Sequence, residues 1–237
     1  MPVAKGDFIL LDYTMRIKET GELFDTTSEE EAKKAGVYKE GSRYEPILII
    51  VGEGWVLKGL DDSLVGLDVG KEQHIEIPPA IGFGERDPSK IRMIPITRFR
   101  RHGGGHISPG MEVEVDGKHG LVRAVGGGRV QVDFNPPLAG KTLVYNVNVK
   151  EILIGDLEKV KALIHRRIPE ISIDKFRIGL SEKEVQIDLP SEAYNIEGIQ
   201  TAIRGLSSDI LRFLPAVEKV VFTQVFFKEK KESSPPA

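Results

Sequence analysis

Alternation of apolar and polar residues predicts β-strands in four parts of the chain. Residues 8–17 alternate and are rich in β-branched and aromatic residues. Shorter apolar runs at 46–51 and 73–77 end at glycine and at a proline pair, which is typical of strands. Residues 142–152 alternate over a length too great for an isolated strand. We therefore expect 142–152 to pair with the N-terminal strands.

A helix is predicted between the second and third of these strands. Apolar residues recur at helical spacing over 55–67, at Val56, Leu57, Leu60 and Leu64. The same spacing puts Asp61 and Asp62 on the solvent side of the helix. Residues 28–36 predict only a short helical turn, rich in Glu and Lys.

The charge and composition of the sequence change between the third and fourth predicted strands. Residues 87–136 hold eight Lys/Arg against five Asp/Glu in a chain whose net charge is −3. Alternating runs at 111–115, 120–125 and 129–134 are separated by glycine turns, a pattern typical of a small barrel or sheet. Since the strands on either side are expected to pair, 87–136 is predicted to be a domain inserted into another.

The end of the chain changes pattern again. It predicts the order helix, two strands, helix and strand, with the elements at 156–168, 176–178, 184–189, 196–213 and 220–227. The predicted inward residues of the second helix are Ile199, Ile203, Leu206, Ile210 and Leu211. This order favours a two-layer α+β domain over 155–230, and the fold class of the whole chain is α+β.

Composition narrows the possible chemistry. The 237 residues contain no cysteine, which excludes disulfides and thiolate chemistry. The N-terminus has no apolar leader and the longest apolar run, 47–51, is far too short to span a bilayer, so we expect a cytoplasmic protein without membrane contact. His102 and His106 lie in a glycine loop that would not fix metal geometry. We expect neither metal nor cofactor.

Four blocks of sequence resemble one family. Phe24-Asp25-Thr26-Thr27, Val56-Leu57-Lys58-Gly59-Leu60, Ile81-Gly82-Phe83-Gly84 and Leu143-Val144-Tyr145-Asn146-Val147 follow the order and spacing of the FKBP-type peptidyl-prolyl cis–trans isomerases. The interruption before the fourth block resembles the SlyD-like branch, and the C-terminal extension resembles the archaeal long-type members.

The resemblance implies an FKBP-like antiparallel sheet wrapped on a short helix, with the small β-rich domain inserted in its flap. The isomerase domain would then comprise 1–86 and 137–152, the inserted chaperone domain 87–136, and the C-terminal domain 155–230. The implied pocket consists of Tyr13, Phe24, Asp25, Ile47, Val56, Leu57, Leu60, Phe83 and Tyr145. The family often has tryptophan at Leu60 and tyrosine at Phe83, so a looser fit for macrolide inhibitors and the loss of one polar anchor are expected.

An apolar cluster in 87–136 is the candidate binding site for unfolded chains. Methionine and aliphatic side chains can adapt to clients of varied sequence. The flanking arginines would favour acidic clients, because opposite charges attract. Packing of the same residues into the domain's own core is the alternative. The cluster consists of Ile91, Met93, Ile94, Ile96 and Phe99.

Two other functions remain open for the sequence. A basic small barrel could bind RNA or the ribosome, although no aromatic pair is placed to stack bases, so nucleic acid is not the expected partner. A holdase that binds chains without catalysis is the second. The expected partners are unfolded, proline-containing polypeptides and a second copy of the chain. The second copy would bind through the C-terminal domain at about 155–230, because the strand at 220–227 is apolar on both faces. A monomer in which Phe222 and Phe226 pack inward is the alternative.

Overall fold

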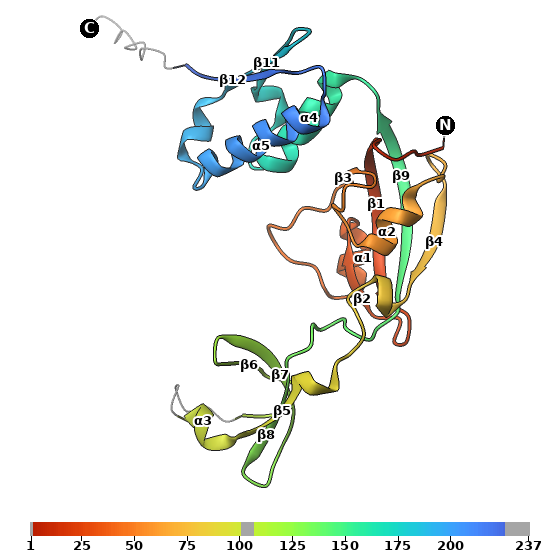
Figure 1. Cartoon of the computed structure of the whole chain (residues 1–237), viewed down its shortest axis with the longest axis vertical. Coiled ribbons are helices and arrows are strands. Elements are labelled where there is room, and N and C mark those ends of the chain that lie inside the picture. The colour runs from red at the N-terminus through yellow and green to blue at the C-terminus, as the bar shows by residue number, and fades with distance from the viewer. Residues whose placement is uncertain (1, 101–106, 226–237) are drawn as a thin grey trace, which may run out of the picture.

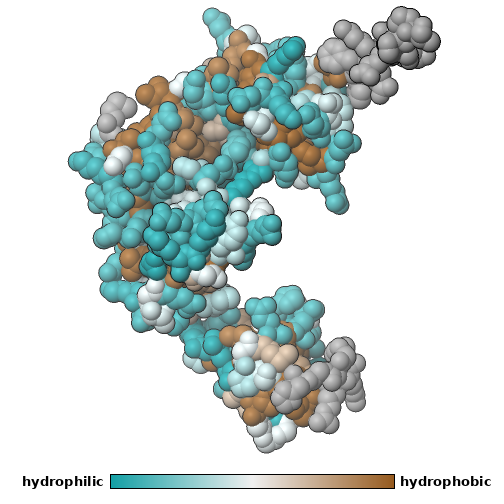
Figure 2. Space-filling model, turned by 180° about the vertical axis from the view of Figure 1, so that it is seen from behind, coloured by the Kyte–Doolittle hydropathy of each residue, from teal (hydrophilic) through white to brown (hydrophobic). Residues whose placement is uncertain are grey.

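A computed structural model describes residues 2–100 and 107–225 of the chain. These residues form three separate β-sheets, which follow one another along the molecule (Figure 1). The space-filling view from behind shows an open hollow between the unit that contains β5–β8 and the rest of the molecule (Figure 2). In the described part of the chain, no helix is long and apolar enough to cross a membrane.

The central sheet is antiparallel and has the order β2-β1-β9-β4, with β3 beside the first half of β1. Its long strands, β1 and β9, pair over ten positions, which confirms the pairing expected for residues 142–152. Two short helices accompany it. The elements are β1 (Phe8–Ile17), β2 (Leu23–Thr26), α1 (Glu29–Lys34), β3 (Ile47–Ile50), α2 (Lys58–Leu64), β4 (Glu72–Ile77) and β9 (Leu143–Leu153).

The two faces of the central sheet have different partners. One face packs on α2, and its cluster includes Leu11, Met15 and Val147 from the sheet with Leu60 and Leu64 from the helix. Burial of these side chains is the main stabilising term for this unit. The other face is apolar only near Phe8, Leu48, Ile50 and Leu153, where the C-terminal helices cover it.

A second, four-stranded antiparallel sheet lies between β4 and β9 in sequence, with the order β5-β8-β7-β6. Its core is small and centres on Ile94, Val122, Val130 and Val132. Short 3-10 turns, η1 (Pro79–Ile81) and η2 (Pro88–Lys90), lead into it. Its elements are β5 (Ile91–Pro95), α3 (Ile96–Arg100), β6 (Glu112–Val115), β7 (Lys118–Gly126) and β8 (Arg129–Asp133).

The C-terminal unit, residues 156–225, packs two helices on a three-stranded sheet of order β10-β11-β12. β10 and β11 form the expected hairpin, whereas β11 and β12 are parallel because α5 crosses over between them. The elements are α4 (Asp156–Arg167), η3 (Ile173–Lys175), β10 (Arg177–Leu180), β11 (Glu184–Leu189), η4 (Ser191–Asn195), α5 (Ile199–Phe213) and β12 (Lys219–Gln224).

Three details of the sequence prediction are wrong. The helix expected over 55–67 begins only at Lys58, since the preceding residues form a glycine turn with φ of +85° at Gly52 and +69° at Gly54. Asp61 is not on the solvent side but 5% exposed. Leu211 is 44% exposed, because Leu206, Ile210 and then Leu214 already fill the inward face of α5.

Candidate active site

Two tyrosines from neighbouring strands form the centre of the predicted pocket. The rings of Tyr13 on β1 and Tyr145 on β9 lie 5.9 Å apart, centroid to centroid, tilted by 46°. The Tyr13 hydroxyl donates to Asp25 Oδ2 at 2.6 Å, and Asp25 Oδ1 accepts from the Thr26 N–H at 2.9 Å. Asp25 therefore fixes the direction of the Tyr13 ring from the edge of the pocket.

Both phenols stay protonated in this setting. Burial is the first cause that raises the pKa of Tyr13, and the hydrogen bond to Asp25 and its negative charge raise the pKa further. Burial also raises the pKa of Tyr145, with the charge of Asp25 as the second cause. At neutral pH the pair is thus a neutral, mostly apolar wall.

The nine predicted pocket residues divide into two groups. Leu60 and Tyr145 are buried in the cluster beneath α2, and Tyr13, Ile47, Val56 and Leu57 pack against the same cluster. The structure thus brings together six of the nine residues expected at the pocket. Asp25 joins them through its hydrogen bond to Tyr13.

Phe24 and Phe83 lie outside that cluster and are 48% and 39% exposed. Phe24 is the extra residue of a β-bulge, because Asp25 pairs with Met15 while Leu23 already pairs with Arg16. Phe83 follows η1, whose Ile81 approaches Gly59 of α2. Both rings are available to a ligand, since the fold does not use them as core.

Asp61 is a site residue that the sequence prediction missed. Its carboxylate accepts from the N–H of Gly52 at 2.8 Å and from that of Gly54 at 2.9 Å. It thereby holds the loop of residues 51–57, called here the pocket loop, which carries Val56 and Leu57. The sequence pattern that could have revealed this role is an acidic residue in a predicted helix, seven residues after a glycine turn whose two N–H groups need acceptors.

Gly59 is a second residue that was missed. A Cβ there would come within 2.8 Å of the Ile77 side chain and 3.0 Å of that of Ile81. α2 can therefore approach β4 and the loop of Phe83 only because this position has no side chain.

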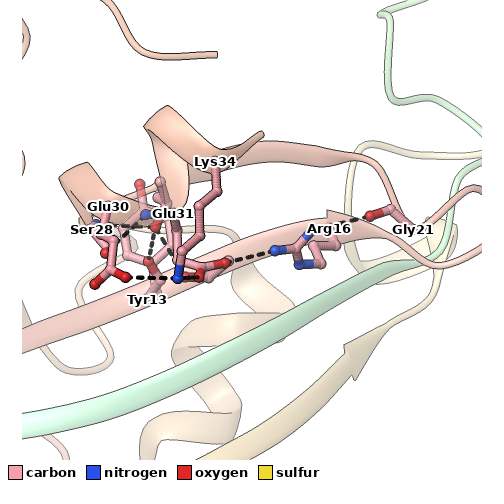
Figure 3. A network of polar contacts seen from close by, with 9 residues as sticks. Tyr13, Arg16, Gly21, Ser28, Glu30, Glu31 and Lys34 are labelled. Carbon is pink, nitrogen blue, oxygen red and sulfur yellow. Dashed lines mark hydrogen bonds and ion pairs between the residues drawn. The ribbon is translucent and has the colours of Figure 1, made fainter. Parts of the chain in front are cut away.

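A polar network fixes the segment that follows Phe24 (Figure 3). Arg16 of β1 donates to Glu31 of α1 at 2.8 Å and to the Gly21 carbonyl at 3.2 Å. Ser28 caps α1 by accepting from the Glu31 N–H. Lys34 reaches Glu30 at 2.7 Å. These contacts tie α1 to the strand that carries Tyr13.

The β5–β8 unit presents a groove of about 410 Å³. Met93 is 53% exposed at this groove, and the nearly buried Ile94 also lines it. Ile96 and Phe99 instead pack against the small core, and Ile91 is partly buried, so the predicted cluster is divided between groove and core. The lining residues are Lys90, Arg92, Met93, Ile94, Pro95, Arg98, Val115, Asp116, Lys118 and Phe134.

Two connecting segments, residues 82–90 and 133–140, form a neck between this unit and the central sheet. Asp133 is 2% exposed and accepts from Arg86 at 2.5 Å and from Arg123 at 3.1 Å. Asn135 donates to Asp133 and exchanges two hydrogen bonds with the backbone of Asp87. Burial alone would raise the pKa of Asp133, but these hydrogen bonds outweigh it and lower the pKa to about 2.

No group of three or more histidine or acidic side chains in the described residues is arranged to hold a metal ion. The loop that contains His102 and His106 lies outside the described residues, as do Arg101 and the phenylalanines at 226 and 227. The side chain of Arg100 is also not described.

Comparison with known proteins finds two family models that match separate parts of the chain and relatives that cover about two thirds of it. The family model described as "FKBP26_C-terminal" matches residues 156–227, and the one described as "FKBP26, IF domain" matches residues 92–138. A short-type peptidyl-prolyl cis-trans isomerase of Methanocaldococcus jannaschii is 34% identical over 158 residues, which cover 66% of this chain and 98% of that protein.

Two bacterial proteins are more distant. The FKBP-type 16 kDa peptidyl-prolyl cis-trans isomerase of Escherichia coli is 28% identical over 63% of this chain and 93% of its own length. The FKBP-type isomerase SlyD of Aeromonas hydrophila is 29% identical over 68% of this chain and 69% of its own length. Taken with the four sequence blocks and the antiparallel sheet packed on α2, these matches show that the chain belongs to the family of FKBP-type peptidyl-prolyl cis–trans isomerases.

Proposed function

We propose that this protein isomerises Xaa-Pro peptide bonds in a pocket walled by Tyr13, Val56 and Phe24, over a floor formed by the buried Tyr145 and Leu60. The single observation that carries the proposal is the neutral aromatic pair over an apolar floor, with its one carboxylate, Asp25, engaged by Tyr13. Such a surface offers no nucleophile. It suits a reaction in which no covalent bond changes.

Rotation about an Xaa-Pro bond must cross a barrier of ~18–20 kcal/mol, because twisting removes the resonance of the planar amide. The planar amide is the more polar state, so removal from water disfavours it more than the twisted state. The pocket would hold the proline ring while the preceding carbonyl turns. Acceleration by ten thousandfold requires only ~5.5 kcal/mol of differential stabilisation.

Leu57 supplies the proposed polar anchor. It precedes the first residue of α2, where backbone N–H groups have no partner within the helix, and its carbonyl accepts the N–H of Asp61. By resemblance to the family, the Leu57 N–H binds a substrate carbonyl. Phe83 offers no hydroxyl for this purpose, so the anchor rests on the backbone.

Isomerisation of a short Xaa-Pro peptide, followed by exchange NMR, tests this proposal. The intact protein should accelerate exchange between the cis and trans signals, and a proline-limited refolding reaction should become faster as well. Failure to accelerate the peptide at micromolar protein would refute the isomerase assignment. Acceleration of neither reaction, with suppression of client aggregation, would favour a holdase.

We also propose that the groove of the β5–β8 unit binds unfolded polypeptide. In support, it combines apolar side chains, including Met93 and Phe134, with four basic residues against one acid, Asp116. Arg98 pairs with Asp116 at 3.2 Å, and three basic residues remain to attract acidic clients. The same basic rim would be the RNA contact under the alternative, so a salt-dependent gel shift with RNA separates the two partners.

A homodimer through the C-terminal unit remains our proposal for assembly. β12 is an edge strand that, among the described residues, pairs only with β11. Val220 and Phe222 pack on the unit's own core, while Val221 faces the other side of the sheet and Val225 is exposed. Pairing with the same edge of a second copy would cover these backbone groups.

A further inference from the structure

The pocket loop makes contacts on its outer side with the C-terminal unit. The ring of Trp55 lies beneath the guanidinium of Arg166, 4.1 Å from its centre, and meets the ring of Phe213 edge-on at 5.7 Å. Glu53 accepts a hydrogen bond from Arg212. Arg166 belongs to α4, and Phe213 and Arg212 to the end of α5. Two alternate residues of this loop are thus held by helices more than 100 residues away in sequence.

On its inner side the same loop is held by α2. Gly52 and Gly54 donate their N–H groups to the buried carboxylate of Asp61. The anchors therefore alternate along four consecutive residues: inward at 52 and 54, outward at 53 and 55. A segment held on both sides has few conformations left, and the next two residues are Val56 and Leu57 of the pocket.

We propose that the C-terminal unit is part of the isomerase machinery, because through Trp55 it positions the backbone of Val56 and Leu57. This inference rests on the proposed isomerase function and assigns Trp55, Arg166 and Phe213 as positioning residues. Displacement of a substrate-binding group by about 1 Å can cost as much as a hundredfold in rate. The coupling is reciprocal, so a peptide bound in the pocket must also change the surroundings of Trp55.

The chain offers a matched pair of variants on one helix. Arg166→Met removes the cation over Trp55. Lys159→Met removes the cation that lies 5.5 Å from the ring centre of Phe8. Phe8 lies at the same interface, but it belongs to β1 and not to the pocket loop. Both variants keep a long apolar side chain in place of a cation, so they should lose similar stability.

The full-length protein and its variants are compared in the exchange assay with a short Xaa-Pro peptide. We expect Arg166→Met to lower kcat/KM by about tenfold, mainly through a raised KM, and Lys159→Met to change it by less than about twofold. Arg166→Lys should restore part of the loss. Since Trp55 is the only tryptophan of the chain, peptide binding should shift its emission in the parent, with a smaller shift in Arg166→Met.

The outcomes separate the two ideas. An active parent whose Arg166→Met and Lys159→Met variants have equal kcat/KM would overturn the positioning role and leave the isomerase function standing. A loss in both variants that follows their melting temperatures would overturn it too, as would an emission unchanged by a peptide that is turned over. A parent without isomerase activity would refute the proposed function and this inference with it.

Discussion

Replacing Asp133 by Asn should loosen the neck that joins the β5–β8 unit to the central sheet. Asp133 is almost fully buried and gathers donors from three side chains, Arg86, Arg123 and Asn135. Asparagine keeps the shape of the side chain but removes its charge, so both guanidinium groups lose their anionic partner. Charge-assisted hydrogen bonds of this kind contribute about 1.5–3 kcal/mol each.

The lowered pKa of Asp133 expresses the contribution of the same hydrogen bonds. A fall from the ordinary 3.8 to about 2 in the folded state corresponds to about 2 kcal/mol. Because the folded-state pKa is the lower one, this stability is fully present above about pH 4 and is lost as the pH falls towards 2. Acid should therefore open the β5–β8 unit of the parent in the same way as the substitution does at neutral pH.

Hydrogen exchange measures the opening directly. At neutral pH the amides of Val130 and Val132 on β8 should lose about thirtyfold in protection in Asp133→Asn, the equivalent of about 2 kcal/mol, while those of β1 stay unchanged. Asp116→Asn is the control, since its pair with Arg98 is exposed and lies in the same unit. Equal protection of β8 in the two variants would refute the reasoning.

The remaining predictions concern the pocket, the β5–β8 unit and assembly. Phe24→Ala should remove most of the kcat/KM for a short peptide. It should lower the melting temperature less than Tyr145→Ala does, because Phe24 is exposed and Tyr145 is buried. An unchanged kcat/KM would exclude Phe24 from the pocket. A chain without residues 87–136 would be closed near Gly84 and Gly140, where the Gly140 N–H donates to the Gly84 carbonyl. It should still isomerise peptides but accelerate the refolding of a protein client at least tenfold less, because the local concentration of client falls. Equal refolding rates for the two chains would rule out the chaperone role. Light scattering should give twice the monomer mass at micromolar concentration and the monomer mass for Val221→Lys, and a monomeric parent would contradict the dimer.

Periodicity was enough to predict the strands and helices whose contacts lie on one continuous face. The strands at 8–17 and 143–153 alternate because each has a packed side and a more polar side. Their pairing was predicted from the alternation at 8–17 and 142–152. The helix expected over 156–168 is α4, whose buried residues Val160, Leu163 and Ile164 recur at helical spacing. Such patterns are local and can be read without knowledge of any partner.

The candidate site was predictable only in part. The sequence blocks pointed to the aromatic and aliphatic residues, and six of them do pack on or in one cluster. The bulge that exposes Phe24 was not visible, since it depends on how β2 and β1 are registered. A bulge is a property of two strands, and neither sequence specifies it alone.

Tertiary structure alone decided the environment of the pocket loop. Helical spacing placed Asp61 in solvent, yet it is buried because two glycine N–H groups nine and seven residues earlier need an acceptor. The same spacing made Trp55 part of a helix, whereas it lies between Arg166 and Phe213 of the C-terminal unit. Contacts between residues so distant in sequence produce no periodic pattern of apolar residues in either segment, so only the folded chain reveals them.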